Sequence, residues 1–300
     1  MRSNGVINSD PAYCCFTCKN NGTHWRFCAR RKMPSADMLY QHNHLLIEPA
    51  DDLPIKAHAA PRVAPSYFYA DQLATIYQFP PPSDTPITIA VISFGGGLFG
   101  NIDTNGVITG GDLQAYWSSR GIAPANQPKV VVKPVDGARN NTADLNSTFE
   151  NTLDIQTIGA CYPSSKLTII LYIGPNTFSE FPKILTAATS PTSVNGKSYG
   201  TPKIVSISWG APEIYYSAAQ LTEMNAIMQS ATSKGINICV ATGDNGSNNG
   251  VGGSSSYTDF PSSSPFCTAV GGTRLVCPRI VVGRSRIVGD GGGSVFSAGR

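Results

Sequence analysis

Ile87-Thr88-Ile89-Ala90-Val91-Ile92-Ser93-Phe94 is a continuous apolar and β-branched stretch that runs directly into glycines at positions 95–97. Such a stretch suits a strand buried on both faces, as strands of parallel sheets are. Similar stretches alternate with helical patterns, which predicts an α/β fold with a mostly parallel sheet and crossover helices. The expected strands are residues 87–94, 130–135, 167–173, 204–209, 236–242 and 268–270, and the expected helices are residues 70–77, 112–120, 147–160, 180–188 and 217–234.

The composition is that of a globular protein with few charges. Charged residues make up 14% of the chain and hydrophobic residues 41%, a balance typical of secreted hydrolases and unusual in cytosolic helical proteins. The net charge of +3 is scattered, apart from a short basic run at residues 30–32, so we expect no nucleic-acid partner. No segment approaches the roughly 18 apolar residues of a membrane helix, so we expect no membrane anchor. We expect a monomer.

The beginning of the chain differs from the rest. Residues 1–65 form a Cys-bearing segment that ends in a Pro- and Ala-rich linker, and we expect residues 66–300 to form one domain. The first residues lack the apolar core of a signal peptide, which leaves the compartment open. The segment could be a zinc-binding interaction module, although it has no standard ligand spacing, or an unstructured leader. Its candidate ligands are Cys14, Cys15, Cys18, His24, Cys28, His42 and His44. Further along, Cys267 and Cys277 are close enough in sequence to form a disulfide.

Glu150 and Asp154 are carboxylates four residues apart in a chain that has no histidine after His58. On a helix they would project from one face as neighbours, and their repulsion would raise one pKa, so that one could accept a proton while the other positions it. Two ordinary explanations compete with this one. Ser147 followed by Glu150 has the form of a capping box, and Asp154 could be a solvated surface residue.

Three strand exits are further candidate sites, because ligands of parallel α/β sheets gather at the carboxyl ends of the strands. Asp244 follows the strand expected at 236–242. It could be an ordinary turn residue, or a protonated carboxyl that donates a hydrogen bond to an oxyanion. Trp209 and Gly210 follow another strand. The glycines at 95–97 lack the spacing of a nucleotide-binding fingerprint, which favours a flexible rim.

Six short motifs follow one another along residues 66–300. They are Glu150-x-x-x-Asp154, Ser206-Ile207-Ser208-Trp209-Gly210, Gly243-Asp244-Asn245-Gly246-Ser247, Phe260-Pro261-Ser262-Ser263-Ser264-Pro265, Ala269-Val270-Gly271-Gly272-Thr273 and Gly291-Gly292-Gly293-Ser294. In this order they resemble the sedolisins, also called serine-carboxyl peptidases. The resemblance implies a subtilisin-like α/β fold with helices on both faces of the sheet. It also implies cleavage of peptide bonds at acidic pH through an acyl-enzyme.

The resemblance also assigns roles to individual residues. It makes Glu150 the general base, Asp154 its orienting partner and Asp244 the acid of the oxyanion hole. Ser208, Trp209 and Gly210 would pair with the backbone of a peptide or protein substrate as an added strand. Family members are secreted or lysosomal.

The chain departs from the family pattern in three places. The family's nucleophile lies in a Gly-Thr-Ser motif downstream of the Gly-Gly-Gly segment, and the 300 residues contain no such motif. We therefore expect a fold that is incomplete at its carboxyl end and a chain that is inactive as it stands. A non-catalytic peptide-binding protein is the alternative. The family's calcium site also belongs to that downstream part, so we expect no cofactor or metal within this chain. Finally, Ser93 stands where some relatives carry an acidic residue.

Overall fold

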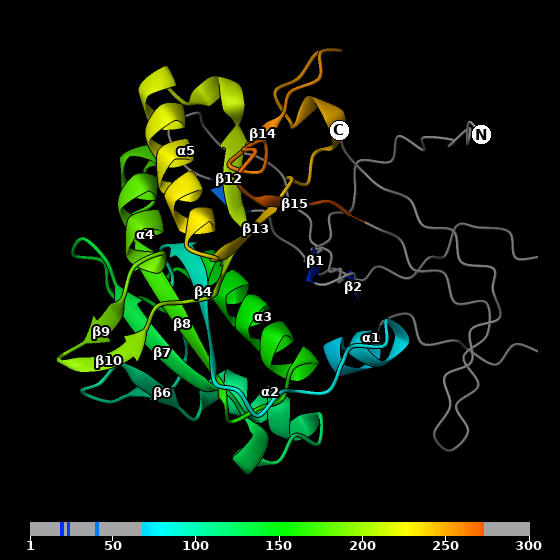
Figure 1. Cartoon of the computed structure of the whole chain (residues 1–300), viewed down its shortest axis with the longest axis vertical. Coiled ribbons are helices and arrows are strands. Elements are labelled where there is room, and N and C mark those ends of the chain that lie inside the picture. The colour runs from blue at the N-terminus through cyan, green and yellow to red at the C-terminus, as the bar shows by residue number, and fades with distance from the viewer. Residues whose placement is uncertain (1–18, 21–22, 25–39, 42–67, 273–300) are drawn as a thin grey trace, which may run out of the picture.

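The computed structural model describes residues 68–272 and three two-residue strands near the amino terminus, β1 (Lys19–Asn20), β2 (Thr23–His24) and β3 (Tyr40–Gln41). An eight-stranded sheet lies at its centre, in the order β15-β13-β11-β4-β8-β7-β6-β5 (Figure 1). Pairs from β15 to β7 are parallel, and β6 and β5 add an antiparallel edge. The strands are β4 (Ile87–Phe94), β5 (Asn101–Ile102), β6 (Val107–Thr109), β7 (Lys129–Pro134), β8 (Leu167–Gly174), β11 (Ile204–Ile207), β13 (Asn237–Ala241) and β15 (Thr268–Val270).

The helices lie where the sequence predicts them, with ends that shift by one or two residues. They are α1 (Ala70–Ile76), α2 (Gly111–Ser119), α3 (Leu145–Cys161), α4 (Phe181–Ala188) and α5 (Ala218–Ser233). Short 3-10 turns occur at Pro124–Asn126, Phe178–Glu180, Glu213–Tyr215 and Gly246–Asn248. The predicted α/β fold with a mostly parallel sheet is therefore confirmed.

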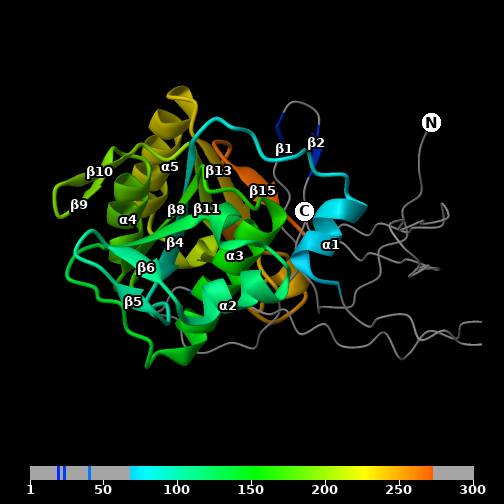
Figure 2. The same cartoon turned by 90° about the horizontal axis from the view of Figure 1, so that it is seen from below.

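The sheet separates two hydrophobic cores, one on each face. Along β4, Ala90, Ile92 and Phe94 pack with residues of α4 and α5, whereas Val91 packs with residues of α2 and α3. Figures 1 and 2 show α4 and α5 on one side of the sheet and α2 and α3 on the other. This alternation explains why β4 is apolar at nearly every position, because each face of the strand meets a layer of helices.

The stretch at residues 204–209 was predicted as one strand, but the structure divides it. β11 ends at Ile207, and β12 (Trp209–Pro212) joins a separate sheet of order β14-β12-β3, where β14 is Asp259–Phe260. Ser208 lies at the break, is fully buried, and has its side chain bonded to a helix instead of pointing into a sheet. Hydropathy could not show this break, because both halves are apolar.

The sequence analysis also missed a short hairpin, β9 (Thr192–Val194) with β10 (Lys197–Gly200). Asn195 and Gly196 connect its strands, and both have positive φ angles, 46° and 86°. Asn-Gly is the strongest short-range hairpin signal, because both central residues of a type I′ turn need that conformation. The signal was present in the sequence and was overlooked between longer elements.

The prediction of a flexible rim at residues 95–97 was wrong. Gly96 and Gly97 are buried. Gly96 has φ +68°, and a Cβ placed on it would lie 2.5 Å from the backbone carbonyl carbon of Ser147. These glycines let the end of β4 approach the first turn of α3, so their role is close packing.

Gly159 of α3 supports a first stability prediction. A Cβ at this position would lie 2.4 Å from the buried ring of Trp117. Glycine to alanine inside a helix ordinarily stabilises by about 1 kcal/mol. Here overpacking should reverse the sign, and Gly159→Ala should lower the free energy of unfolding in urea by about 1–3 kcal/mol. Trp117→Phe, which shortens the clashing ring, should be less costly in the Gly159→Ala background than alone, and strictly additive losses would contradict the clash.

The division into residues 1–65 and 66–300 stays a prediction. Apart from the three short strands, residues 1–67 lie outside the described part of the chain, and so do residues 273–300. Cys277 is among them, and so are all the candidate zinc ligands of the amino-terminal segment except His24, which lies in β2.

Candidate active site

The first turn of α3 is anchored by Asp144, which is the N-cap residue. Its side chain accepts hydrogen bonds from the backbone N–H of Ser147 at 3.3 Å and from the Ser147 hydroxyl at 2.7 Å. The helix therefore begins before Ser147, and Ser147 is its third residue instead of its cap. The capping-box explanation for Glu150 is wrong, because Glu150 lies in the second turn with its side chain only 1% exposed.

Asp154 lies one turn further along α3 and is bonded to the break between β11 and β12. The Ser208 hydroxyl donates to the Asp154 carboxylate, at 3.1 Å from Oδ1 and 3.0 Å from Oδ2. Burial raises the pKa of Asp154 to about 7, and the hydrogen bond from Ser208 opposes that rise. Asp154 is therefore not an ordinary solvated residue.

Asp244 follows β13 and is 5% exposed. The pKa of Glu150 is raised well above its usual value, first by burial and then by the negative charges of Asp154 and of Asp244. For both charges to act on Glu150, the three carboxyl groups must lie close together. The structure thus brings the three predicted acids to one place at the carboxyl ends of β11 and β13.

The predicted substrate-binding residues border this acidic site. Trp209 and Gly210 begin β12, and the Trp209 ring is buried and packs edge-on against Phe94, with 5.5 Å between the ring centroids. One edge of β12 pairs with β14, and at the other edge β3 pairs antiparallel, with Gln41 opposite Trp209 and Tyr40 opposite Gly210. The edge that was expected to receive a peptide strand therefore accepts an extended segment of the chain itself.

Two further polar groups lie near the acids, Asn151, which the sequence analysis did not single out, and Ser93, which it noted only as a departure from the family pattern. Asn151 is 1% exposed, and its side chain donates to the carbonyl oxygens of Gly95 and Gly97, both at 3.4 Å. The Ser93 hydroxyl also donates to Gly95, at 3.2 Å. Asn151 ties the β4 exit to the helix that carries Glu150, whereas the Ser93 bond lies within that exit. The only sequence signal of Asn151 was a polar residue next to Glu150, which is too common to be informative.

The Gly-, Ser- and Asn-rich loop after Asp244 is exposed at many positions but is held in place at Asn249. The side chain of Asn249 donates to Asp259 Oδ1 at 2.7 Å, and both residues are buried. Asn249 has φ +48°, a left-handed conformation that asparagine tolerates better than most residues. The loop is thereby fixed to the strand that starts the Asp259-Phe260-Pro261 motif.

In chemical terms, two carboxyls of the site, those of Glu150 and Asp154, hold protons more tightly than isolated ones. Such groups can accept a proton from a hydroxyl and can donate a hydrogen bond while protonated. Residues 68–272 contain no cluster of three or more His, Cys, Asp or Glu side chains placed to hold a metal ion.

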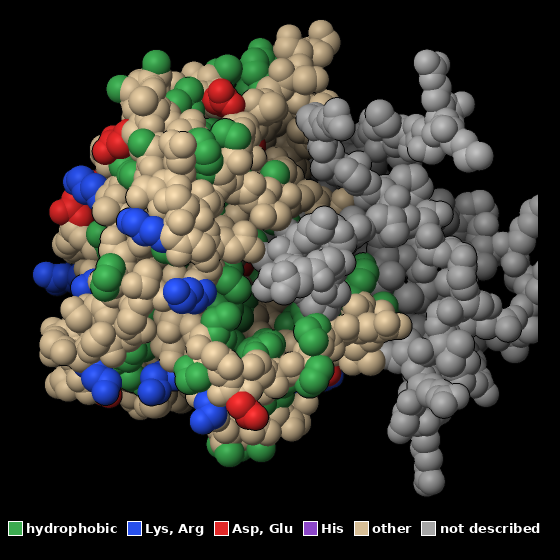
Figure 3. Space-filling view, viewed as in Figure 1, with side chains coloured by type: hydrophobic (Ala, Val, Ile, Leu, Met, Phe, Trp, Pro, Cys, Tyr) green, Lys and Arg blue, Asp and Glu red, His purple; other side chains and the backbone are tan. Residues whose placement is uncertain are grey.

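The outer surface carries few charges. Figure 3 shows Lys and Arg side chains at separate points of one face, among Asp and Glu, with no continuous basic patch there. Within the described ranges, every helix is too short or too polar to cross a membrane.

Comparison with known proteins identifies a relative that shares most of this chain. No family model matches the chain. The chain is 36% identical over 237 residues to kumamolisin from Bacillus sp. (strain MN-32), an alignment that covers 77% of this chain and 39% of kumamolisin. The chain thus spans about two fifths of the length of that relative. The ordered motifs, the subtilisin-like α/β fold and this identity lead to one conclusion: over the matched region, the chain belongs to the sedolisin family of serine-carboxyl peptidases.

Proposed function

We propose that residues 66–300 are the acid-bearing part of a serine-carboxyl peptidase domain that cleaves peptide bonds at acidic pH through an acyl-enzyme. The observation that carries the proposal is the placement of the three carboxyls: Glu150 and Asp154 lie one turn apart on α3, Asp154 accepts a hydrogen bond from Ser208 at the end of β11, and Asp244 follows the neighbouring strand β13. Side chains from a helix and from a strand exit 90 residues further along the chain have no structural need to meet in this way. A shared chemical task accounts for it.

In this proposal Glu150 is the general base. It accepts the proton of a serine hydroxyl as the serine oxygen attacks the carbonyl carbon of the scissile bond, and it returns the proton to the leaving amine. Asp154 acts as a positioning residue. Ser208 holds it at 3.0–3.1 Å, and its raised pKa lets it share a proton with Glu150.

Asp244 is proposed to stabilise the tetrahedral intermediate. A protonated carboxyl can donate a hydrogen bond to the negatively charged oxygen, a task that enzymes of neutral pH usually assign to an amide. Because only the protonated form donates, the reaction should require acidic solution. The peptide would take the place of β3 along the edge of β12 at Trp209 and Gly210, and the antiparallel pairing of β3 there supports this part of the proposal.

The nucleophilic serine is the one part of this mechanism that the 300 residues do not provide, since they contain no Gly-Thr-Ser motif. We therefore expect the 300-residue chain to bind peptides without cleaving them. The test combines fluorescence anisotropy with labelled peptides, a peptide-hydrolysis assay at about pH 4 and a serine-directed covalent probe. Hydrolysis together with covalent labelling would contradict the expected inactivity, and absence of any peptide binding would contradict the proposal as a whole.

The same experiment separates the peptidase from a peptide-binding protein without catalysis. A longer version that includes a downstream Gly-Thr-Ser segment should cleave peptides at acidic pH, and Glu150→Gln should lower kcat in it. If that version binds peptides as well as before and still gives no turnover, the non-catalytic alternative is correct.

A further inference from the structure

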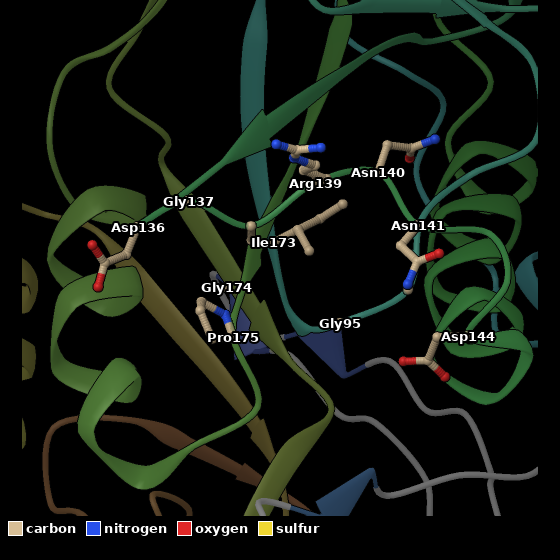
Figure 4. Close-up of a pocket in the computed structure, with 12 residues that line it drawn as sticks. Gly95, Asp136, Gly137, Arg139, Asn140, Asn141, Asp144, Ile173, Gly174 and Pro175 are labelled. Atoms are coloured by element: carbon tan, nitrogen blue, oxygen red, sulfur yellow. The ribbon is translucent and has the colours of Figure 1, made fainter.

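A pocket of about 450 Å³ opens beside the acidic site. Its walls are the β4 exit at Gly95 and Gly96, the connection from β7 to α3 at residues 136–144, and the end of β8 at residues 173–175. Figure 4 shows Arg139 and Asn140 on one side, Gly95 on the opposite side, and Asp136 and Asp144 at two separate ends. The volume falls within the range of pockets that bind small molecules or side chains.

The strand order makes this pocket a continuation of the acidic site. Asp244 follows β13 and Ser208 follows β11, and the pocket lies at the carboxyl ends of the next three strands in the sheet, β4, β8 and β7. The same helix serves both places, because Ser147 lies three residues before Glu150 on α3 and its hydroxyl donates to Asp144 of the pocket at 2.7 Å and to the carbonyl oxygen of Phe94 at 3.4 Å. In the proposal, a side chain of a peptide bound across the acids enters the pocket.

The walls of the pocket are rigid. The Asn140 side chain accepts a hydrogen bond from Leu98 N at 2.7 Å and donates one to Leu98 O at 3.0 Å. The backbone N–H of Asn141 donates to the carbonyl oxygen of Gly96 at 2.9 Å. The connection from β7 is thereby fixed to the β4 exit, and the pocket exists before any ligand arrives.

The charged side chains around the pocket differ in whether they already form ion pairs or hydrogen bonds. The Lys183 ammonium pairs with Asp136 at 2.5 Å and with Glu180 at 2.8 Å. Asp144 accepts two hydrogen bonds from Ser147. Arg139 is exposed and, among the residues that the structure describes, has no ion pair and no side-chain hydrogen bond. Within the described part of the chain, the Arg139 guanidinium is therefore available to pair with a ligand.

We propose that this pocket is a specificity subsite that takes an acidic side chain of the bound peptide, with Arg139 as its counter-charge. The inference rests on the proposed peptide-binding function and adds a substrate preference to it. An arginine presents a planar fork of donors that matches a carboxylate in two places. Lysine-bearing peptides would be repelled by the same group.

The test uses the 300-residue chain and a set of peptides in which each position carries Glu, Gln or Lys in turn. At about pH 6 a substrate Glu is ionised, and we expect one position at which Glu binds on the order of 3- to 10-fold more tightly than Gln, the range for a partly exposed charged pair. At about pH 3 the Glu is protonated and the preference should disappear. Asp136, Asp144, Glu180 and Lys183 are the other titratable groups around the pocket. A Gln peptide measured in parallel removes the part of their effect that both peptides share, and the Arg139 variant below isolates the part that depends on the peptide charge.

Arg139→Gln should abolish the Glu preference and leave binding of the Gln peptide unchanged. Lys129→Gln is the matched control, because it removes one positive charge from an exposed residue at the opposite end of β7, and it should keep the preference. If peptides bind but no position prefers Glu, or if Arg139→Gln keeps the preference, the subsite is wrong and the proposed function stands. If no peptide binds at all, both the subsite and the proposed function are wrong.

Discussion

The free energy of unfolding is expected to increase as the pH falls from about 7 to about 4, by up to about 4 kcal/mol from Asp154 alone. Burial places the pKa of Asp154 at about 7 in the folded chain, whereas an aspartate in an unfolded chain titrates near 3.9. Between these values the folded state binds the extra proton. The stabilising contribution is therefore complete below the unfolded pKa and is lost as the pH rises through the folded one.

Glu150 also makes the chain more stable as the pH falls. Its pKa is raised as well, first by burial and then by its acidic neighbours. The contributions of the two residues are coupled through their shared protons, so their sum is smaller than two independent shifts. The ion pair of Asp136 with Lys183 opposes the trend, since it lowers the pKa of Asp136. That pair is exposed and should contribute little.

Urea unfolding at several pH values between 4 and 7 measures this effect. Asp154→Asn is the informative variant, because an amide can still accept the hydrogen bond from Ser208 but does not titrate. Its stability should vary less with pH than that of the unchanged chain. If the stability of the Asp154→Asn variant and that of the unchanged chain vary with pH in parallel, Asp154 is not the source of the pH dependence.

Gly96→Ala is expected to be among the most damaging single substitutions, with a loss of about 3 kcal/mol or more. Two costs add at this position. The residue has φ +68°, which costs an L-amino acid about 1–2 kcal/mol. The new Cβ would also lie 2.5 Å from the Ser147 backbone, which cannot swing away as a flexible side chain can. Relief would require α3 to move, and Glu150 would move with it.

Gly121→Ala is the matched control for this prediction. Gly121 also has a positive φ, +76°, but no atom lies within 4 Å of the position that its Cβ would take. It should cost only the backbone term of about 1–2 kcal/mol. Equal losses for the two variants in urea unfolding would mean that the close approach of β4 to α3 contributes nothing. In the Gly96 variant, peptide binding should weaken as well.

The strands that the sequence predicted best are continuous runs of apolar and β-branched residues that stay within one sheet. β4 and β15 have the predicted bounds for this reason. The beginning of α3 was placed two residues late, since Asp144 is the cap and an aspartate can take that role in many contexts. The break at Ser208 depends on a partner 54 residues away in the sequence, and no local pattern reports such a contact.

The acidic site could likewise be predicted only in part, because it also depends on contacts between residues far apart in the sequence. The spacing of Glu150 and Asp154 was compatible with a shared helix face, but spacing alone could not tell a buried pair from a solvated one. Asp244 was assigned through the family resemblance, and its proximity to Glu150 follows from the sheet order, in which β13 and β11 are neighbours. Arg139 was not noticed, because an arginine in a polar connection has no meaning until the surrounding walls are known.

The order of strands also bears on how the chain acquires its fold during synthesis. β4 is the earliest strand of the central parallel group, yet its partners are β8, where Ile87 lies opposite Leu167, and β11, where Ile89 lies opposite Ile204. Such distant pairings make folding slow. The nascent chain must carry an unpaired, highly apolar strand until much of the remaining sequence has left the ribosome, and during that interval it is exposed to self-association. Chaperone demand during translation should therefore peak before β11 emerges.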